Sequence, residues 1–121
     1  MTPQSIAPVL HVSNLDTALK HYLAVFGFEE DFRFEGYVGI KLGAIALHLV
    51  VAEPATPRFA NSKVYIFCDE VDDYYATLKA RGATLKSAPI TAWYGMRDFI
   101  AHDLDGNQLS FGCEVPPPAK P

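Results

Sequence analysis

The spacing of apolar residues along the chain predicts two short helices. Apolar side chains recur at intervals of three and four residues from Leu15 to Phe26 and again from Val71 to Arg81, which places them on one face of a helix. Asn14 stands directly before the first run, where its side chain can cap the helix. Gly27 and Gly82 follow the two runs, where a left-handed residue commonly ends a helix. Both segments are therefore predicted to be one-sided helices.

Around the helices the apolar and polar residues alternate with a period of two, which is the pattern of half-buried strands. One strand is expected before each helix, at Ile6–Val12 and at Val64–Cys68. The strands expected after the helices are Phe32–Phe34, Tyr37–Leu42 and Ala44–Val51 in the first half, and Thr84–Lys86, Phe99–His102 and Gln108–Cys113 in the second. Glycines and the step Asp105-Gly106-Asn107 mark the turns between them. Each half therefore has the order βαβββ.

This order predicts an α+β fold in which two tandem βαβββ modules, residues 5–52 and 63–113, form a half-barrel-like cleft. The modules are expected to make one domain over residues 1–113, since the chain of 121 residues is long enough to bury a core. Residues 53–62, with Pro54 and Pro57, are the expected linker. Residues 114–121 are rich in proline and are expected to form a disordered tail.

Composition and charge exclude several classes of partner. Lys and Arg number 10 against 14 Asp and Glu, and there is no basic stripe, so nucleic acid is not an expected partner. No apolar run is long enough for a membrane span or a signal peptide, which predicts a cytoplasmic protein with no membrane partner. Cys68 and Cys113 lie among apolar neighbours and are expected to be reduced thiols.

The paired βαβββ units and three segments of the chain resemble the vicinal oxygen chelate superfamily, which includes glyoxalase I, extradiol dioxygenases and bleomycin resistance proteins. The segments are the opening Pro8–Leu15 and the closing runs Trp93–Phe99 and Asp103–Gly112. The resemblance covers residues 5–113, and the closing runs look most like the bleomycin resistance branch. It implies a small-molecule ligand held in the cleft.

Enzymes of this superfamily bind a divalent metal with one ligand on the first strand and one on the last strand of each module. In this chain the resemblance places the first-strand positions at Ala7 and Lys63. Alanine has no donor atom, and a protonated lysine repels a cation. The last-strand positions fall on His48 and Ser110. A single plausible ligand does not make a metal site, so no metal and no other cofactor is expected.

Alternation along the strands indicates which side chains face the cleft. His48 lies on the opposite side of its strand from Leu47 and Leu49, which are expected to face the helix. Side chains of the same parity complete an apolar and aromatic lining, as expected of a small-molecule site. The predicted ligand-binding residues on strands and nearby segments are His11, His48, Tyr65, Phe67 and Ser110, together with the aromatic side chains of Phe32, Phe34, Tyr37 and Phe59.

Trp93 and Tyr94 complete the predicted ligand-binding set. They lie in the expected loop after Pro89, and loops on a rigid scaffold often carry recognition residues. In bleomycin resistance proteins the matching Trp stacks on the ligand, so the resemblance implies the same role for Trp93. Two structural alternatives stay open: Trp93 fills the domain or a dimer interface, and the two histidines only satisfy hydrogen bonds within a filled cleft. Arg97 and Asp98 are expected to form an ion pair that fixes this loop.

The sequence thus favours a metal-free binding protein that sequesters an antibiotic, such as a bleomycin-like compound, or a related aromatic metabolite. A homodimer is expected, with grooves between subunits, because strands at the edges of a half-closed module expose backbone groups. One alternative is a glyoxalase- or dioxygenase-like metal-dependent lyase, isomerase or oxygenase that uses His48. Another is a metal-free enzyme with His11 or His48 as general base.

Overall fold

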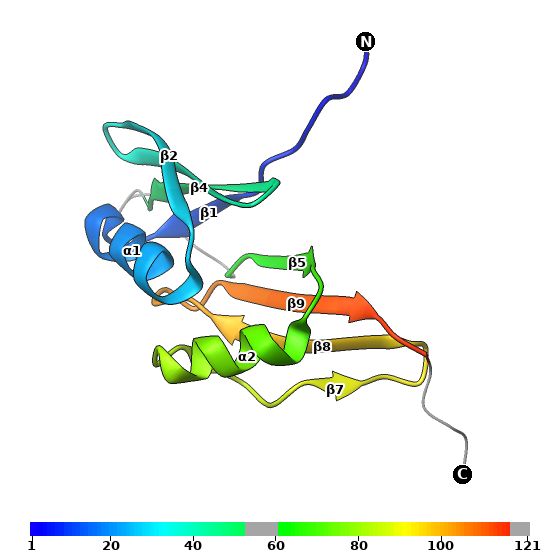
Figure 1. The fold of residues 1–121 in the computed structure, drawn as a ribbon. Helices are drawn as coiled ribbons and strands as arrows, with labels where there is room; N and C mark the ends of the chain where they lie inside the picture. The colour runs from blue at the N-terminus through cyan, green and yellow to red at the C-terminus, as the bar shows by residue number, and fades with distance from the viewer. Residues whose placement is uncertain (53–60, 117–121) are drawn as a thin grey trace. The chain divides into compact units, whose positions relative to one another are not determined.

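A computed structural model describes residues 1–52 and 61–116, which fall into two compact units, residues 1–62 and 63–121 (Figure 1). In the first unit, β1 (Val9–Val12) is followed by helix α1 (Leu15–His21) and a π-helix, η1 (Tyr22–Phe26). Three antiparallel strands then follow, namely β2 (Glu29–Phe34), β3 (Tyr37–Leu42) and β4 (Ile45–Val51). The sheet has the order β1-β4-β3-β2, in which β1 is parallel to β4.

The second unit repeats this topology. It comprises β5 (Lys63–Phe67), helix α2 (Val71–Ala80), two short strands, β6 (Thr84–Leu85) and β7 (Ile90–Thr91), and the long hairpin of β8 (Met96–His102) and β9 (Gln108–Glu114). The sheet has the order β5-β9-β8-β6, with β5 parallel to β9 and β7 also paired to β8. The predicted α+β class and the repeated βαβββ order are confirmed, with one additional short strand in the second unit, where β6 and β7 both precede the hairpin.

Each sheet is covered on one face by the helix of its own unit (Figure 1). Under α1 and η1 lie side chains that alternate along β1 and β4, and under α2 lie those of β5, β8 and β9. The buried strand residues are Leu10, Val12, Leu47 and Leu49 in the first unit and Ile66, Phe99, Leu109 and Phe111 in the second. The predicted helix-facing sides of β1, β4, β5 and β9 are therefore correct, and the opposite faces of the sheets carry the candidate site.

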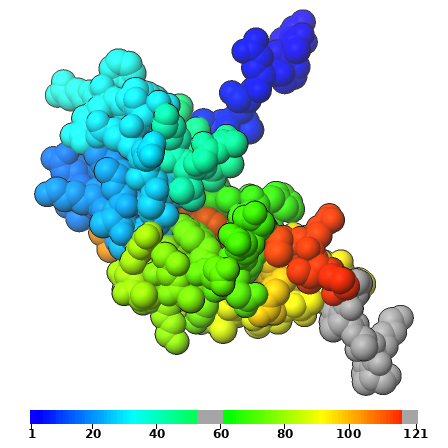
Figure 2. All heavy atoms as spheres, viewed as in Figure 1, coloured from blue at the N-terminus to red at the C-terminus, as the bar shows by residue number. Residues whose placement is uncertain are grey.

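Several predicted element boundaries need correction. Strand β2 begins at Glu29 rather than Phe32, β8 begins at Met96 rather than Phe99, and β9 ends at Glu114, inside the expected tail. The first strand begins at Val9 rather than Ile6, and residues 1–8 have no regular structure. Figure 2 shows residues 1–6, in dark blue, projecting from the first unit as an exposed arm. The first helix changes to π geometry at Tyr22, where the N–H of Gly27 bonds the Tyr22 carbonyl, so the predicted helix is two segments. The expected loop after Pro89 contains β7.

The two helices begin differently. Asn14 caps α1 as predicted, because its side-chain oxygen accepts a hydrogen bond of 2.9 Å from the N–H of Thr17. Glu70, which precedes α2, makes no side-chain cap and has a left-handed φ of 47°. Both helices are followed by left-handed glycines, Gly27 and Gly82, as predicted. No helix of residues 1–52 and 61–116 has the length and apolar composition needed to cross a membrane.

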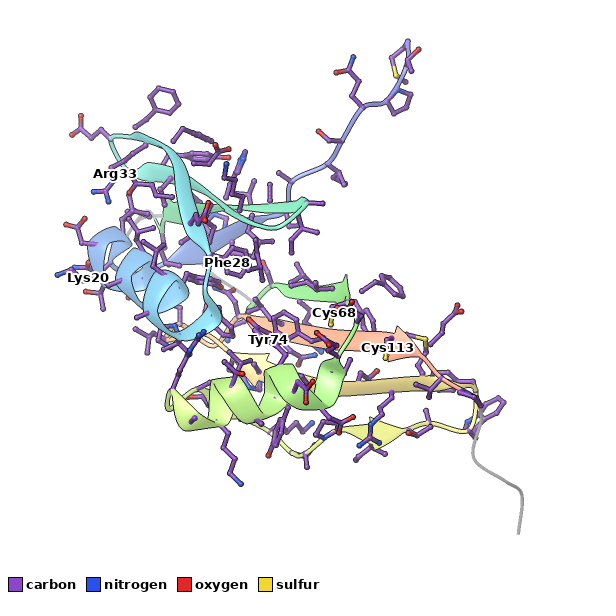
Figure 3. All side chains as sticks on the ribbon, in the orientation of Figure 1. Lys20, Phe28, Arg33, Cys68, Tyr74 and Cys113 are labelled. Carbon is purple, nitrogen blue, oxygen red and sulfur yellow. The ribbon has the colours of Figure 1, made fainter. Side chains whose placement is uncertain are left out.

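The second unit also holds both cysteines. Cys68 follows β5 and Cys113 lies in β9; both are free thiols and half-buried (Figure 3). The Cys68 N–H donates to the carbonyl of Gly112 over 2.9 Å, which extends the β5–β9 ladder by one residue. Burial raises the pKa of the Cys68 thiol, and nearby Cys113 raises it further.

Candidate functional sites on the open faces of the two sheets

The first open face is the side of the β1-β4-β3-β2 sheet away from α1. Across its middle, Val9, His48, Gly39 and Phe32 are successive register partners on the four strands. The Phe32 ring lies directly over Gly39, where a β-carbon would collide with it. A glycine on β3 therefore allows an aromatic ring from the edge strand to lie flat on the sheet beside His48.

His48 and Tyr37 form the polar centre of this face. The Tyr37 hydroxyl and the Nδ1 atom of His48 are hydrogen-bonded at 2.7 Å, and both side chains are half-buried. When the phenol donates to Nδ1, the imidazole proton is on Nε2. The Phe32 ring meets His48 edge-on at 5.0 Å and stacks parallel to Tyr37 at 6.2 Å. The pair is therefore a polar group held among aromatic side chains.

Two more predicted residues share the first open face. Phe34 contacts Phe32 with ring centroids 5.6 Å apart and is 69 % exposed. His11 is exposed, and its register partner is Val50, one row beyond His48. The structure therefore gathers Phe32, Phe34, Tyr37 and His48 into one aromatic cluster, and it leaves His11 at the edge of that cluster. Phe59, another predicted member, lies outside the described residues.

The second open face is the side of the β5-β9-β8 sheet away from α2. Tyr65 and Ser110 are register partners on it, as are Phe67 and Gly112. The Tyr65 ring extends diagonally over Gly112, and its hydroxyl donates to Oδ2 of Asp98 on β8 over 2.8 Å. Tyr65 and Phe67 contact each other at 5.0 Å, and Ser110 is buried beside them. The predicted residues Tyr65, Phe67 and Ser110 are thus brought together.

Burial and the hydrogen bond to Asp98 raise the pKa of the Tyr65 hydroxyl, in that order of importance. The nearby Tyr94 hydroxyl raises it further by electrostatic repulsion between ionised forms. The phenol therefore stays neutral near pH 7 and remains a hydrogen-bond donor to the carboxylate. This relation also places Tyr94 within electrostatic range of the second open face.

Trp93 and Tyr94 lie in the turn between β7 and β8, with rings edge-to-face at 5.5 Å. The turn is closed by backbone bonds from Ala92 to Met96 and from Gly95 to Ala92, and Gly95 has a φ of 89°. Trp93 is 82 % exposed and Tyr94 59 % exposed. Trp93 therefore does not fill the core of the second unit, and one of the two structural alternatives for it is removed.

The predicted ion pair between Arg97 and Asp98 is wrong. Adjacent residues of a strand point to opposite faces, so the two side chains diverge. Arg97 points to the helix side, where its guanidinium donates to both carboxylate oxygens of Asp72 at 2.9 and 2.7 Å and to the Thr91 hydroxyl at 3.0 Å. The Arg97 guanidinium lowers the pKa of the Asp72 carboxyl. Arg97 ties α2 to β8, and Asp98 is left for the second open face.

The four positions of the superfamily metal site do not fit a metal in this chain. Ala7 lies two residues before Val9, the register partner of His48, and Lys63 lies two residues before Tyr65, the partner of Ser110. Ala7 offers only a methyl group, Lys63 a protonated ammonium and Ser110 a hydroxyl. His48 is therefore the only one of the four positions that offers a nitrogen ligand. Among the described residues no group of three or more His, Cys, Asp or Glu side chains could hold a metal ion.

Sequence reasoning missed Asp98 and the two glycines that lie under aromatic rings. The turn at Asp103–Asn107 sets the β8–β9 register, which pairs Asp98 with Gly112. Counting back from that turn would have placed Asp98 on the same face as Tyr65. The role of Gly39 was harder to find, because the bulge in β2 at Asp31 shifts the register that brings Phe32 over it.

A sequence model of the Glyoxalase/Bleomycin resistance protein/Dioxygenase superfamily matches residues 5–111. Solved structures with similar folds include the following three. A glyoxalase/bleomycin resistance protein/dioxygenase from Nocardioides is 17 % identical, with a TM-score of 0.77, and the match covers 100 % of this chain and 91 % of that one. TioX from Micromonospora sp. ML1 is 20 % identical, with a TM-score of 0.73 and coverages of 92 % and 100 %.

The third structure is a lactoylglutathione lyase from Agrobacterium tumefaciens, 23 % identical, with a TM-score of 0.75 and coverages of 93 % of this chain and 95 % of that one. No curated protein matches the chain. At these identities the likeness to the three structures concerns the fold.

Proposed function

The chain belongs to the Glyoxalase/Bleomycin resistance protein/Dioxygenase superfamily, and from that premise we propose that it binds an aromatic small molecule without a metal and without changing its bonds. The observation that carries the proposal is the aromatic cluster of the first open face. Phe32, Tyr37 and His48 offer flat apolar surface around a hydrogen-bonded pair at 2.7 Å. Such a combination of apolar rings with few polar groups suits a small-molecule site.

The proposed ligand is a flat aromatic compound with at least one hydrogen-bonding group. Its rings would stack on Phe32 and Phe34, which contributes on the order of 0.5–1.5 kcal/mol per ring pair beyond area burial. Its polar group would bond to the His48 imidazole. Sequestration of an antibiotic of the bleomycin type, or of a related metabolite, would need no metal. The exposed pair Trp93 and Tyr94 offers a separate aromatic surface on the second unit.

The metal-dependent alternative is disfavoured by the side chains at its ligand positions. A glyoxalase- or dioxygenase-like reaction would need donors where the chain has Ala7 and Lys63. Metal-free acid–base catalysis by His48 is the second candidate function, and one observation favours it. The bond to Tyr37 fixes the imidazole on the open face, so that Nε2 is the nitrogen that would meet a substrate.

Titration with a bleomycin-type glycopeptide and a panel of flat aromatic compounds tests the proposal. Binding should be saturable, and Phe32→Ala should weaken it about 5- to 10-fold. Leu23→Ala, an exposed apolar change on the helix side, is the matched control and should leave the affinity unchanged. Consumption of the bound compound by the wild-type protein would contradict sequestration and favour catalysis by His48.

Elemental analysis of protein purified without chelator should find well under one equivalent of zinc, nickel, iron or manganese. Stoichiometric metal that is lost on His48→Ala would overturn the metal-free proposal.

Two further proposals concern assembly and compartment. We propose a twofold homodimer, because β1 and β5 are edge strands of their sheets and expose backbone groups. Light scattering that reports a monomer at micromolar concentration would remove the dimer. We also propose a cytoplasmic location, with which reduced Cys68 and Cys113 would be consistent. Fractionation of cells that express the tagged chain tests it.

A further inference from the structure

One end of the second open face combines negative charge with exposed aromatic surface. Asp98 lies there in the row formed with Gly112 and Phe67, and Glu114 follows in the next row as the register partner of Met96. Phe67 is 73 % exposed and Tyr65 41 % exposed. Together with Tyr94 in the adjacent turn, these side chains form what we call the acidic aromatic patch: Tyr65, Phe67, Tyr94, Asp98 and Glu114.

Within the described residues no basic side chain pairs with Asp98. Its sequence neighbour Arg97 points to the opposite face and is held by Asp72 and Thr91. The nearest lysine on the same face along β5 is Lys63, four residues from Phe67, which is about 13 Å along a strand. At that distance its charge is largely screened at physiological salt. The negative charge of the patch is therefore not compensated from its own surface.

The Asp98 carboxylate is held in place by a hydrogen bond and can accept further hydrogen bonds. One oxygen, Oδ2, accepts the Tyr65 hydroxyl at 2.8 Å, which fixes the carboxylate beside the aromatic rings. An ionised carboxylate has about four lone-pair sites, so Asp98 can accept further hydrogen bonds. A phenol is protonated near pH 7, so the Tyr65 hydroxyl can keep donating to Asp98 there.

We propose that the acidic aromatic patch binds an organic ammonium ion, with Asp98 as the counter-charge and the neighbouring rings as its walls. An ammonium group attracts the faces of aromatic rings, an effect of about 0.5–2 kcal/mol for each favourable contact. A carboxylate adds charge attraction at the same point. The patch lies on the second unit alone and does not depend on the aromatic-ligand function proposed for the first open face.

Choline and its uncharged isostere 3,3-dimethylbutan-1-ol test the proposal on the full chain. Trp93 is the only tryptophan, and its ring is 5.5 Å from that of Tyr94, so its fluorescence reports on the patch. Choline should bind saturably, and the isostere at least about 5-fold more weakly. No saturation up to 100 mM choline, or equal binding of the isostere, would overturn the proposal.

Three substitutions locate the binding. Asp98→Asn should weaken choline binding about 5- to 20-fold, and Phe67→Leu about 3- to 10-fold. Asp73→Asn, which removes one charge from an exposed position on α2, is the control for net charge and should leave affinity within about 2-fold. Equal losses from Asp98→Asn and Asp73→Asn would mean unspecific charge attraction and would overturn the site.

Tyr65→Phe provides a second test of choline binding in case Asp98→Asn lowers stability. This change keeps the ring and removes the hydroxyl that bonds Asp98, so choline affinity should be retained or rise up to about 3-fold. A loss as large as that of Asp98→Asn would overturn the assigned role of the carboxylate. Because Phe32→Ala affects the first open face only, it should leave choline binding unchanged, which separates this outcome from the aromatic-ligand titration.

Discussion

The central rows of the two open faces show how far the repeat extends. In the first unit the last strand carries His48 beside Val9, and in the second it carries Ser110 beside Tyr65. In the first unit an aromatic ring enters from the β2 edge and lies over Gly39, whereas in the second a ring enters from the β5 edge and lies over Gly112. The repeat therefore maintains the strand order and the face on which each side chain lies. It does not maintain which edge strand supplies the aromatic ring that covers the glycine.

The polar atoms beside these rings differ in kind. The first ring lies against a histidine bonded to a phenol, a pair that can donate and accept, and the second carries a hydroxyl bonded to a carboxylate that only accepts. One scaffold thus presents two surfaces suited to different partners. Superfamily membership predicts the scaffold for both units, and the side chains on each open face determine what each can bind.

The two units are expected to differ most in how much substitutions in their hairpin turns lower the free energy of unfolding. In the second unit Asp103, buried with Asn107, accepts hydrogen bonds from the N–H of Asp105 at 2.9 Å and from the N–H and amide of Asn107, both at 2.8 Å. Asp103→Ala leaves those donors unsatisfied and should lower the free energy of unfolding by about 2–4 kcal/mol in urea titrations. The corresponding turn of the first unit is short and exposed, so Ala44→Ser should change stability by less than about 0.5 kcal/mol. Similar small changes in both would contradict the structural role of Asp103.

The glycines under the rings come next. Neither Gly39 nor Gly112 has a left-handed φ, so alanine is tolerated by the backbone and tests only the space above it. Each substitution should displace a ring, Phe32 or Tyr65, and lower the free energy of unfolding by about 1–2 kcal/mol. Chemical denaturation measures this loss. Adding Phe32→Leu to Gly39→Ala should recover part of the loss, and no recovery would mean that the collision with Phe32 is not its cause.

The helix starts differ by a smaller amount. Asn14→Ala removes the bond to the N–H of Thr17 and should destabilise the protein by about 1 kcal/mol. Glu70→Ala removes no cap, so the free energy of unfolding should change by less than about 0.3 kcal/mol. Thermal unfolding of the two variants beside the wild type makes the comparison. An equal loss at Glu70 would show a contribution from its side chain other than capping.

The smallest contrast concerns the two phenols. Tyr37→Phe deprives half-buried His48 of its partner and should lower stability by about 0.5–1 kcal/mol. Tyr65→Phe removes a bond in a more exposed place, and water can replace the hydroxyl at Asp98, so a change of less than about 0.5 kcal/mol is expected. Urea titrations of both variants measure the difference. A larger loss of stability from Tyr65→Phe than from Tyr37→Phe would contradict this expectation.

Much of the fold follows from local signals in the chain. The cap at Asn14, the left-handed glycines Gly27 and Gly82 and the period-two alternation predicted both helices and the buried side of the main strands. The π-helix could not be predicted, because the apolar spacing of Tyr22 and Phe26 suits an α-helix and a π-helix alike. Strand β7 was missed because two residues show no period.

The sequence predicted which face of each sheet the site residues occupy, but not which residues they contact. Alternation placed His48, Tyr65 and Phe67 on the open faces, since one-residue parity needs no tertiary information. The partners of Tyr37 and Arg97 depend on which strands and helices become neighbours, and these contacts join residues 11 and 25 positions apart. The wrong expectation for Arg97 and Asp98 came from reading sequence neighbours as spatial neighbours, which a strand does not allow.

Because both cysteines lie in the second unit, the rate of thiol modification can report on the opening of that unit alone. The chain has two cysteines, and both Cys68 and Cys113 belong to the second unit, so a thiol reagent reports nothing from the first. Because burial raises the pKa of Cys68, its reactive thiolate is scarce while β5 and α2 stay in place. The modification rate of Cys68 in increasing denaturant therefore measures how often the second unit opens, whether or not the first opens with it.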